Sequence, residues 1–148
     1  MPVYSENKKA KFDYEILEKF EAGLILTGPE VKSIRSGSVS LKGAFVTFHR
    51  NDANITNLHI PKYKYAGSVL NYDPERTKKL LLKRKEINYL RGKSEEKGLT
   101  IVPISLYTRG RHIKVEIAIC RGKKKYDKRE TIKRRELKRE LGRKIKGG

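Results

Sequence analysis

Hydrophobic and polar residues alternate along much of the first 120 positions, as they do in strands that bury one face. The pattern predicts strands over residues 16–27, 39–49, 55–60, 99–107 and 112–120. The last strand alternates most regularly, with Ile113, Val115, Ile117 and Ile119 on the inner face and His112, Lys114 and Glu116 on the outer face. Residues 108–111, which include Gly110, predict a hairpin turn before it.

Two segments carry helix signals instead. Proline is common where a helix begins and glycine just after a helix ends. Pro29 and Gly37 therefore predict a short helix over residues 30–35. Asp73-Pro74-Glu75 predicts a second helix, with an apolar face that begins at residues 80–82 and an end at Gly98. Residues 1–10 are expected to form a flexible arm, and residues 61–72 a surface loop. Five or six short strands with one substantial helix predict a small antiparallel β-barrel over residues 1–121, of a kind that often binds oligonucleotides.

The C-terminal segment, residues 122–148, changes this picture by its charge. From Arg121 to the end, the chain holds fourteen Lys or Arg residues and four acids, a net charge of +10 within a total of +19. Its bulky aliphatic side chains are too few to offset the entropy of ordering the segment. Leu137, Leu141 and Ile145 could form one stripe of a helix when the segment is bound. We expect a tail that is disordered in the free protein and binds a polyanion such as RNA or DNA.

Other residue patterns argue against catalysis. Cys120 is the one cysteine, which rules out an intramolecular disulfide or a Cys-based zinc site, and it is expected to be a buried structural thiol. His49, His59 and His112 show no metal-ligand spacing, and no acid pair indicates a general acid and base. The first residues show no apolar signal-peptide region, and no apolar run is long enough to span a membrane, so we expect neither a leader nor a membrane span. We therefore expect a cytoplasmic binding protein with no metal, cofactor or membrane contact.

Aromatic residues among cations favour nucleic acid as the partner. Tyr63, Tyr65, Tyr72, Tyr107 and Tyr126 alternate with Lys and Arg, so that rings could stack on exposed bases while cations hold phosphates. The alternative for each tyrosine is a half-buried position in the barrel. Tyr126 differs because it lies in the basic segment, away from the expected core.

Five motifs in order make the chain similar to one family, the SmpB or SsrA-binding proteins. Residues 7–10 read Asn-Lys-Lys-Ala, with Asp-Tyr at 13–14, and residues 20–24 read Phe-Glu-Ala-Gly-Leu. Residues 28–37 read Gly-Pro-Glu-Val-Lys-Ser-Ile-Arg-Ser-Gly, and residues 73–82 read Asp-Pro-Glu-Arg-Thr-Lys-Lys-Leu-Leu-Leu. The last motif, at 122–129, reads Gly-Lys-Lys-Lys-Tyr-Asp-Lys-Arg. The resemblance spans about residues 7–129.

The resemblance implies both fold and function. Members form a six-stranded barrel related to the OB-fold, with three helices, and are not enzymes. We expect this chain to be a monomer in solution. They bind the tRNA-like domain of tmRNA (SsrA RNA) and deliver it to stalled ribosomes for trans-translation, in which the stalled peptide is tagged. The body replaces the missing anticodon arm. The tail follows the empty mRNA channel of the small subunit from the decoding site and becomes helical there.

Motif positions assign residues by the same resemblance. Those that fall where the family contacts tmRNA are Lys8, Lys9, Glu21, Leu81 and Lys114. Those that match the tail motifs acting on the ribosome are Gly122, Lys123, Lys124, Tyr126, Asp127, Lys128 and Arg129. The pattern alone places Lys114 outward and Leu81 in a helix core, so for Leu81 the two interpretations stay open. Glu21, a carboxylate on an RNA face, is expected to orient its neighbours or the RNA.

The sequence departs from the family at a few positions. Gly43-Ala44-Phe45 stands where a polar pair before an aromatic is common, and Lys78 replaces a frequent arginine. After Arg129 the tail matches by composition alone. The main rival hypothesis is a structural ribosomal protein, or a general RNA-binding protein, with a basic extension. An RNA-modifying enzyme is a more distant alternative.

Overall fold

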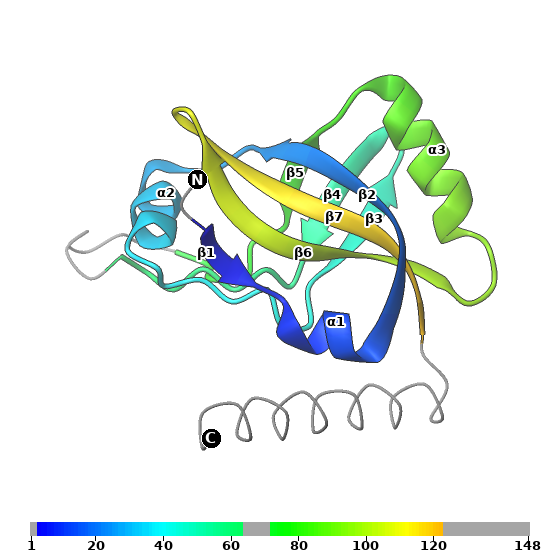
Figure 1. Ribbon diagram of the computed structural model, residues 1–148. Coiled ribbons are helices and arrows are strands. Elements are labelled where there is room, and N and C mark those ends of the chain that lie inside the picture. Colours follow the sequence, from blue (N-terminus) through cyan, green and yellow to red (C-terminus); the bar gives the residue numbers. More distant parts are fainter. Residues whose placement is uncertain (1–2, 64–71, 123–148) are drawn as a thin grey trace, which may run out of the picture.

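A curved antiparallel sheet forms the body of the protein in a computed structural model that describes residues 3–63 and 72–122. Within these residues the sheet has seven strands, in the order β1-β6-β7-β2-β5-β4-β3, and three helices lie around it (Figure 1). The elements are β1 (Val3–Glu6), α1 (Lys8–Asp13), β2 (Tyr14–Leu24), α2 (Gly28–Arg35), β3 (Phe45–His49), β4 (Asp52–Thr56), β5 (Lys78–Leu81), α3 (Arg84–Ser94), β6 (Leu99–Arg109) and β7 (His112–Gly122). The predicted fold class, a small antiparallel barrel with about three helices, is confirmed.

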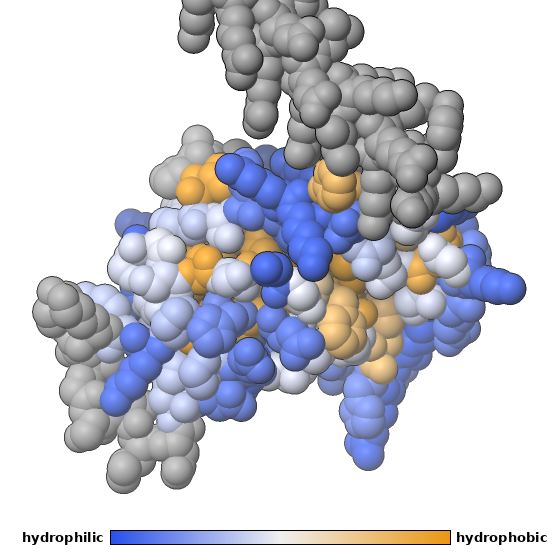
Figure 2. Space-filling view, turned by 90° about the horizontal axis from the view of Figure 1, so that it is seen from below, coloured by the Kyte–Doolittle hydropathy of each residue, from blue (hydrophilic) through white to orange (hydrophobic). Residues whose placement is uncertain are grey.

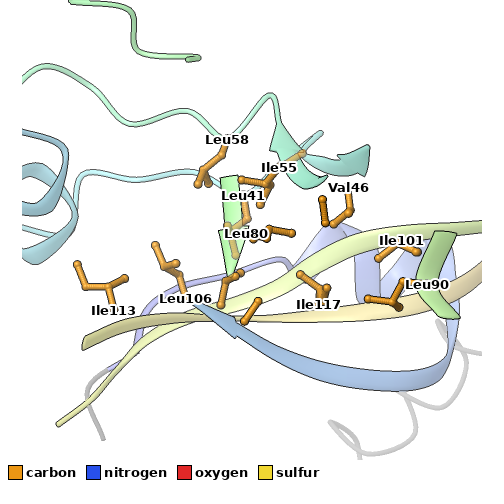
Figure 3. Close-up of a cluster of buried hydrophobic side chains, with 14 of the residues drawn as sticks. Leu41, Val46, Ile55, Leu58, Leu80, Leu90, Ile101, Leu106, Ile113 and Ile117 are labelled. Carbon is orange, nitrogen blue, oxygen red and sulfur yellow. The ribbon is translucent and has the colours of Figure 1, made fainter. Parts of the chain in front are cut away.

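The core lies inside the curve of the sheet. Strands β3 and β4 lie across it from β6 and β7, β5 joins β4 to β2, and β3 also packs against β6 (Figure 1). Aliphatic side chains from both sides meet there (Figure 3). The predicted inner residues of β7 are all buried in this cluster. The fully buried core side chains include Ile34, Leu41, Ile55, Leu58, Ile60, Leu80, Leu90, Ile101, Leu106 and Ile117.

A second, smaller cluster explains why residues 99–107 are apolar on both sides. Val102, Ile104 and Ala118 pack with Ala10 of α1 on the opposite face of β6 and β7. Cys120 belongs to this cluster and is fully buried, as predicted. Burial raises the pKa of its thiol to about 11.

The N-terminal arm is more ordered than we predicted. Residues 3–6 form β1, which pairs with β6, and residues 8–13 form α1. Asn7 organises this segment because its Oδ1 accepts the Ala10 N–H as a helix cap. Its side-chain amide donates to the carbonyls of Leu41 and Pro103, at 3.3 and 3.0 Å. A single buried amide thus ties the arm to the barrel at two distant points of the chain.

The helix predicted over residues 73–98 is wrong in its first half. Asp73 accepts the Glu75 N–H in a turn, and the chain then runs as strand β5 before α3 begins at Arg84. In β5, Lys78 and Leu80 point inward while Lys79 and Leu81 point outward. Leu81 is therefore an exposed strand residue, and its assignment to a helix core was wrong.

Other boundaries differ less. The helix predicted at 30–35 is α2, whose Thr27 and Glu30 form a capping box, and Gly37 follows it with a φ of +85°. Only residues 45–49 of the predicted strand at 39–49 are β3, because a turn centred on Gly43, with a φ of +78°, precedes it. None of the helices in the described residues has the length and apolar character needed to cross a membrane.

Candidate nucleic-acid interface

Four residues form one row across the outer face of the sheet. The register places Tyr107 of β6 opposite Lys114 of β7, Lys114 opposite Gly23 of β2, and Gly23 opposite Leu81 of β5. Directly paired residues point to the same face. Leu81 is 53% exposed, which is unusual for a leucine in a sheet. The structure therefore brings Lys114 and Leu81, which the resemblance had assigned to tmRNA contact, to the same place.

Gly23 allows this close approach. A Cβ atom at this position would lie 3.2 Å from Leu81 Cβ and 3.6 Å from Lys114 Nζ. The backbone of Gly23 does not need a positive φ, so the missing side chain, and not the conformation, is what matters. The glycine leaves a notch in which an apolar and a cationic side chain stand together.

Glu21 lies two residues before Gly23 on the same face, and both of its oxygens are occupied. The Tyr107 hydroxyl donates a short hydrogen bond to one oxygen. The Arg109 guanidinium donates to the other at 2.9 Å. A carboxylate held in this way fixes two neighbours of Lys114. This supports the expectation that Glu21 orients its surroundings.

The electrostatics agree with this arrangement. The Tyr107 hydrogen bond, against a smaller opposing effect of burial, keeps the Glu21 carboxyl pKa below its usual value. The positive charges of Arg109 and Lys114 act in the same direction. Burial and the bond to Glu21 raise the pKa of Tyr107. Glu21 is therefore ionised and Tyr107 protonated at neutral pH, so the hydrogen bond between them persists.

A buried ionic cluster holds β5 and α2 in place beside the row. Glu30 of α2 accepts two hydrogen bonds from Arg76, at 2.7 and 3.2 Å. Lys78 of β5 donates to the Leu58 carbonyl at 2.9 Å and lies 3.9 Å from Glu30. Burial raises the pKa of Glu30, but the bonds from Arg76 and the Thr27 N–H outweigh it and lower the net value. This cluster fixes the strand that carries Leu81.

Lys8 and Lys9 do not join the row. Both are exposed on α1. Lys9 lines a separate groove of about 690 Å³ together with Tyr14, Lys42 and Phe45. The side on which α1 lies shows separate hydrophobic patches between hydrophilic side chains (Figure 2). The predicted contact residues thus fall into two separate groups.

Gly122, the first of the predicted tail residues, is the last residue of β7 and pairs with Tyr14. It places the root of the tail beside α1. Lys123, Lys124, Tyr126 and residues 127–129 lie outside the described residues.

Sequence reasoning missed Arg109 and the role of Gly23. The predicted hairpin at 108–111 contained the needed signal, because a two-residue turn at Gly110-Arg111 pairs Arg109 with His112 and Tyr107 with Lys114. The Glu21 contacts required tertiary structure. Within the described residues, no three His, Cys, Asp or Glu side chains gather as metal ligands would.

The chain is similar in sequence and in structure to proteins of one known family. The sequence model of the family described as SmpB protein matches residues 4–147. An SsrA-binding protein of Acaryochloris marina is 52% identical over 146 residues, covering 99% of this chain and 95% of its own. One from Persephonella marina is 51% identical over 145 residues, covering 98% and 95%. A chain of the solved structure described as "tmRNA-SmpB: a journey to the center of the bacterial ribosome" has a TM-score of 0.71 and 44% identity, covering 89% and 95%.

Proposed function

This chain belongs to the SmpB family, and on that premise we propose that it binds the tRNA-like domain of tmRNA and delivers it to stalled ribosomes for trans-translation. It works in the cytoplasm by binding two RNA partners, tmRNA and ribosomal RNA, and not by catalysis. The observation that carries the proposal is the outer row of the sheet, where residues assigned to tmRNA by family motif meet in space.

Within the row, each side chain has a distinct task. Lys114 contacts a phosphate, and Leu81 gives an apolar surface against which a sugar or base can pack. Glu21 holds Tyr107 and Arg109 in position, and Arg109 is 62% exposed, so its remaining N–H groups are presented to the RNA. Lys114 and Arg109 attract the RNA electrostatically, while Glu21 and Leu81 determine the orientation in which it binds.

The other assigned residues serve two further surfaces. Lys8 and Lys9 on α1 contact RNA away from the row. Gly122, Lys123, Lys124, Tyr126, Asp127, Lys128 and Arg129 act on the ribosome, where the tail occupies the empty mRNA channel and Tyr126 stacks at the decoding site.

A split phenotype tests this division of labour. Replacing Asp127, Lys128 and Arg129 by alanine should leave tmRNA affinity unchanged, because the barrel carries that contact, and should abolish peptide tagging on stalled ribosomes. A matched control replaces residues 138–140 (Lys-Arg-Glu), which removes the same net charge from the tail. Loss of tmRNA affinity in the first variant would contradict the assignment of tmRNA binding to the barrel. Equal loss of tagging in both variants would mean that the tail motif acts only through its net charge.

A further inference from the structure

The barrel has a seam that backbone hydrogen bonds do not close. The order of strands in the sheet begins at β1 and ends at β3, and β3 packs against β6. Within residues 3–63 and 72–122, however, no backbone pairing joins β3 to β6. The groove of about 690 Å³ lies over this seam, with Ala44 and Phe45 from the side of β3 and Thr100 and Val102 from β6 among its lining residues.

The sequence of β6 explains why the seam stays open. Pro103 has no N–H, so it cannot donate a hydrogen bond to a strand beside it. The register of β6 with β7 also shifts between Pro103 and Ser105, as it does at a β-bulge. Pro103 is buried, and a buried backbone carbonyl without a donor is costly. A side chain from another segment must therefore supply the donor.

Asn7 supplies this donor and bridges the seam. Its Nδ2 donates to the Pro103 carbonyl at 3.0 Å and, at 3.3 Å, to the Leu41 carbonyl in the turn that leads into β3. An amide nitrogen carries two hydrogens, so both bonds can form together. Its Oδ1 accepts the Ala10 N–H at 3.1 Å, and its backbone N–H donates to the Ile104 carbonyl at 2.8 Å. The side chain is buried, so water competes little with these bonds.

The same residue sets the position of α1. A helix of six residues is marginal by itself, so α1 depends on its cap and on its packing. Ala10 packs the helix against Ala118 and Cys120 of β7. The chain leaves α1 at Tyr14, which begins β2 and pairs with Gly122 at the root of the tail. A continuous set of contacts thus joins the seam to the tail root.

We propose that Asn7 is a positioning residue for the tail. By bridging the seam and capping α1, it fixes the place and the direction in which the chain leaves the barrel at Gly122. The inference rests on the proposed function, in which the row holds tmRNA while the tail acts on the ribosome. Because the row and the tail root belong to one rigid body, the tail enters the ribosome at a fixed place relative to the bound tmRNA. Asn7 acts through this geometry and contacts no RNA itself.

Asn7→Ser separates the bridge from the cap. Serine caps helices about as well as asparagine does, but its one short hydroxyl cannot reach both carbonyls. The melting temperature should fall by about 5–10 °C, because two buried carbonyls lose their donor. Peptide tagging on stalled ribosomes, measured with saturating tmRNA so that affinity does not enter, should fall about tenfold, since small displacements far from a reacting centre can cost as much.

A core substitution provides the matched control. Ile55 of β4 is fully buried in the main core and does not touch the seam or α1. Ile55→Val and Ile55→Ala bracket the expected loss of stability and should tag as the unaltered chain does. Amide hydrogen exchange at Tyr14 and at residues 118–122 should be faster in Asn7→Ser than in an Ile55 variant of equal melting temperature. This readout reports the tail root and not global stability.

A covalent rescue distinguishes positioning from the loss of RNA contacts on α1. Glu15 and Arg121 are paired across β2 and β7 beside the tail root. Directly opposed residues of antiparallel strands have Cα atoms about 4.5–5.5 Å apart, within the range of a disulfide. Adding Glu15→Cys and Arg121→Cys to Asn7→Ser should restore tagging when the two thiols are oxidised, in a translation system without thiol reductants. The same chain with its introduced thiols reduced and alkylated should not regain it, and Cys120 is buried and does not compete.

The outcomes distinguish this inference from the proposed function. If the unaltered chain binds tmRNA and supports tagging, but Asn7→Ser tags as well as the Ile55 variants, Asn7 has only a structural role and the function stands. Failure of the disulfide to restore tagging would also overturn the inference. If the unaltered chain neither binds tmRNA selectively nor supports tagging, the function itself fails.

Discussion

Replacing Tyr107 by phenylalanine removes one hydroxyl from the outer row and keeps the ring. The lost bond joins Tyr107 to the Glu21 carboxylate, which also holds Arg109 at 2.9 Å. A hydrogen bond to a charged group contributes about 1.5–3 kcal/mol when buried. Here Glu21 is 32% exposed and Arg109 62% exposed, so water competes and about 1 kcal/mol of unfolding free energy is expected to be lost.

The effect on RNA binding follows from the freedom that Arg109 gains. With one anchor of the carboxylate gone, the guanidinium must be ordered when RNA binds, which costs about 0.5–1.5 kcal/mol per side chain. We therefore expect the Kd for the tRNA-like domain to rise about 2- to 12-fold. The number of phosphate contacts does not change, so the salt slope should stay the same.

The chain offers a matched control. Tyr89 of α3 donates to Glu18 at 2.7 Å, so Tyr89→Phe removes the same kind of bond away from the row. Filter binding and thermal melting of both variants would separate stability from recognition. The Tyr89–Glu18 bond is exposed, so Tyr89→Phe should change stability little, and weaker RNA binding is expected only for Tyr107→Phe. A double-mutant cycle with Glu21→Gln should be non-additive, because both changes break one hydrogen bond. Equal affinities of the two tyrosine variants, or full additivity in the cycle, would refute the positioning role of Glu21.

Three further predictions follow from the same contacts. Gly23→Ala should leave the melting temperature nearly unchanged but weaken tmRNA binding in a gel shift, because its Cβ would press Leu81 away from the row; unaltered affinity would show that the notch has no role. Lys114→Ala should lower the salt slope of tmRNA binding by about 0.7–0.9, and an unchanged slope would exclude a phosphate contact. Glu30→Ala should lower the unfolding free energy by about 3 kcal/mol in urea titrations, because Arg76 and Lys78 lose their carboxylate. Because the pKa of Glu30 is lowered from its ordinary value of 4.5, the stabilisation from its carboxylate is present above that value and should be lost as the pH falls through the lowered pKa of the folded state. Glu30→Ala should lack this loss, and a variant as sensitive to acid as the unaltered chain would contradict the prediction.

Periodicity predicted the elements in which local sequence and tertiary burial agree. Strand β7 could be predicted from the sequence because its aliphatic residues occupy every second position and its inner face lies in the main core. Helix α2 could be predicted because Pro29 and Gly37 mark its two ends. In both cases the residues that determine the element lie within it or directly beside it, so no distant contact was needed.

The sequence pattern did not predict strand β5, and the reason is physical. Its sequence, Lys-Lys-Leu-Leu, puts one lysine and one leucine on each face. Burial of Lys78 depends on the Leu58 carbonyl and Glu30, which come from elsewhere in the chain. A sequence pattern that treats every lysine as exposed and every leucine as buried cannot detect such a strand.

The candidate site was predicted in its residues but not in its organisation. Family motifs named Glu21, Leu81 and Lys114, and the structure places them on one face. The bonds from Tyr107 and Arg109 to Glu21 link β6 to β2, strands about ninety positions apart, and no local signal reports them.

The most direct test of the central claim is a competition gel shift on the tRNA-like domain of tmRNA. The full chain and a chain ending at Gly122, which retains both buried clusters, would each be challenged with excess elongator tRNA. Tight binding by both chains that resists the competitor is the predicted result, because recognition lies in the barrel. Loss of binding without the tail, or equal displacement by any tRNA, would mean generic attraction of a polyanion and would contradict the account.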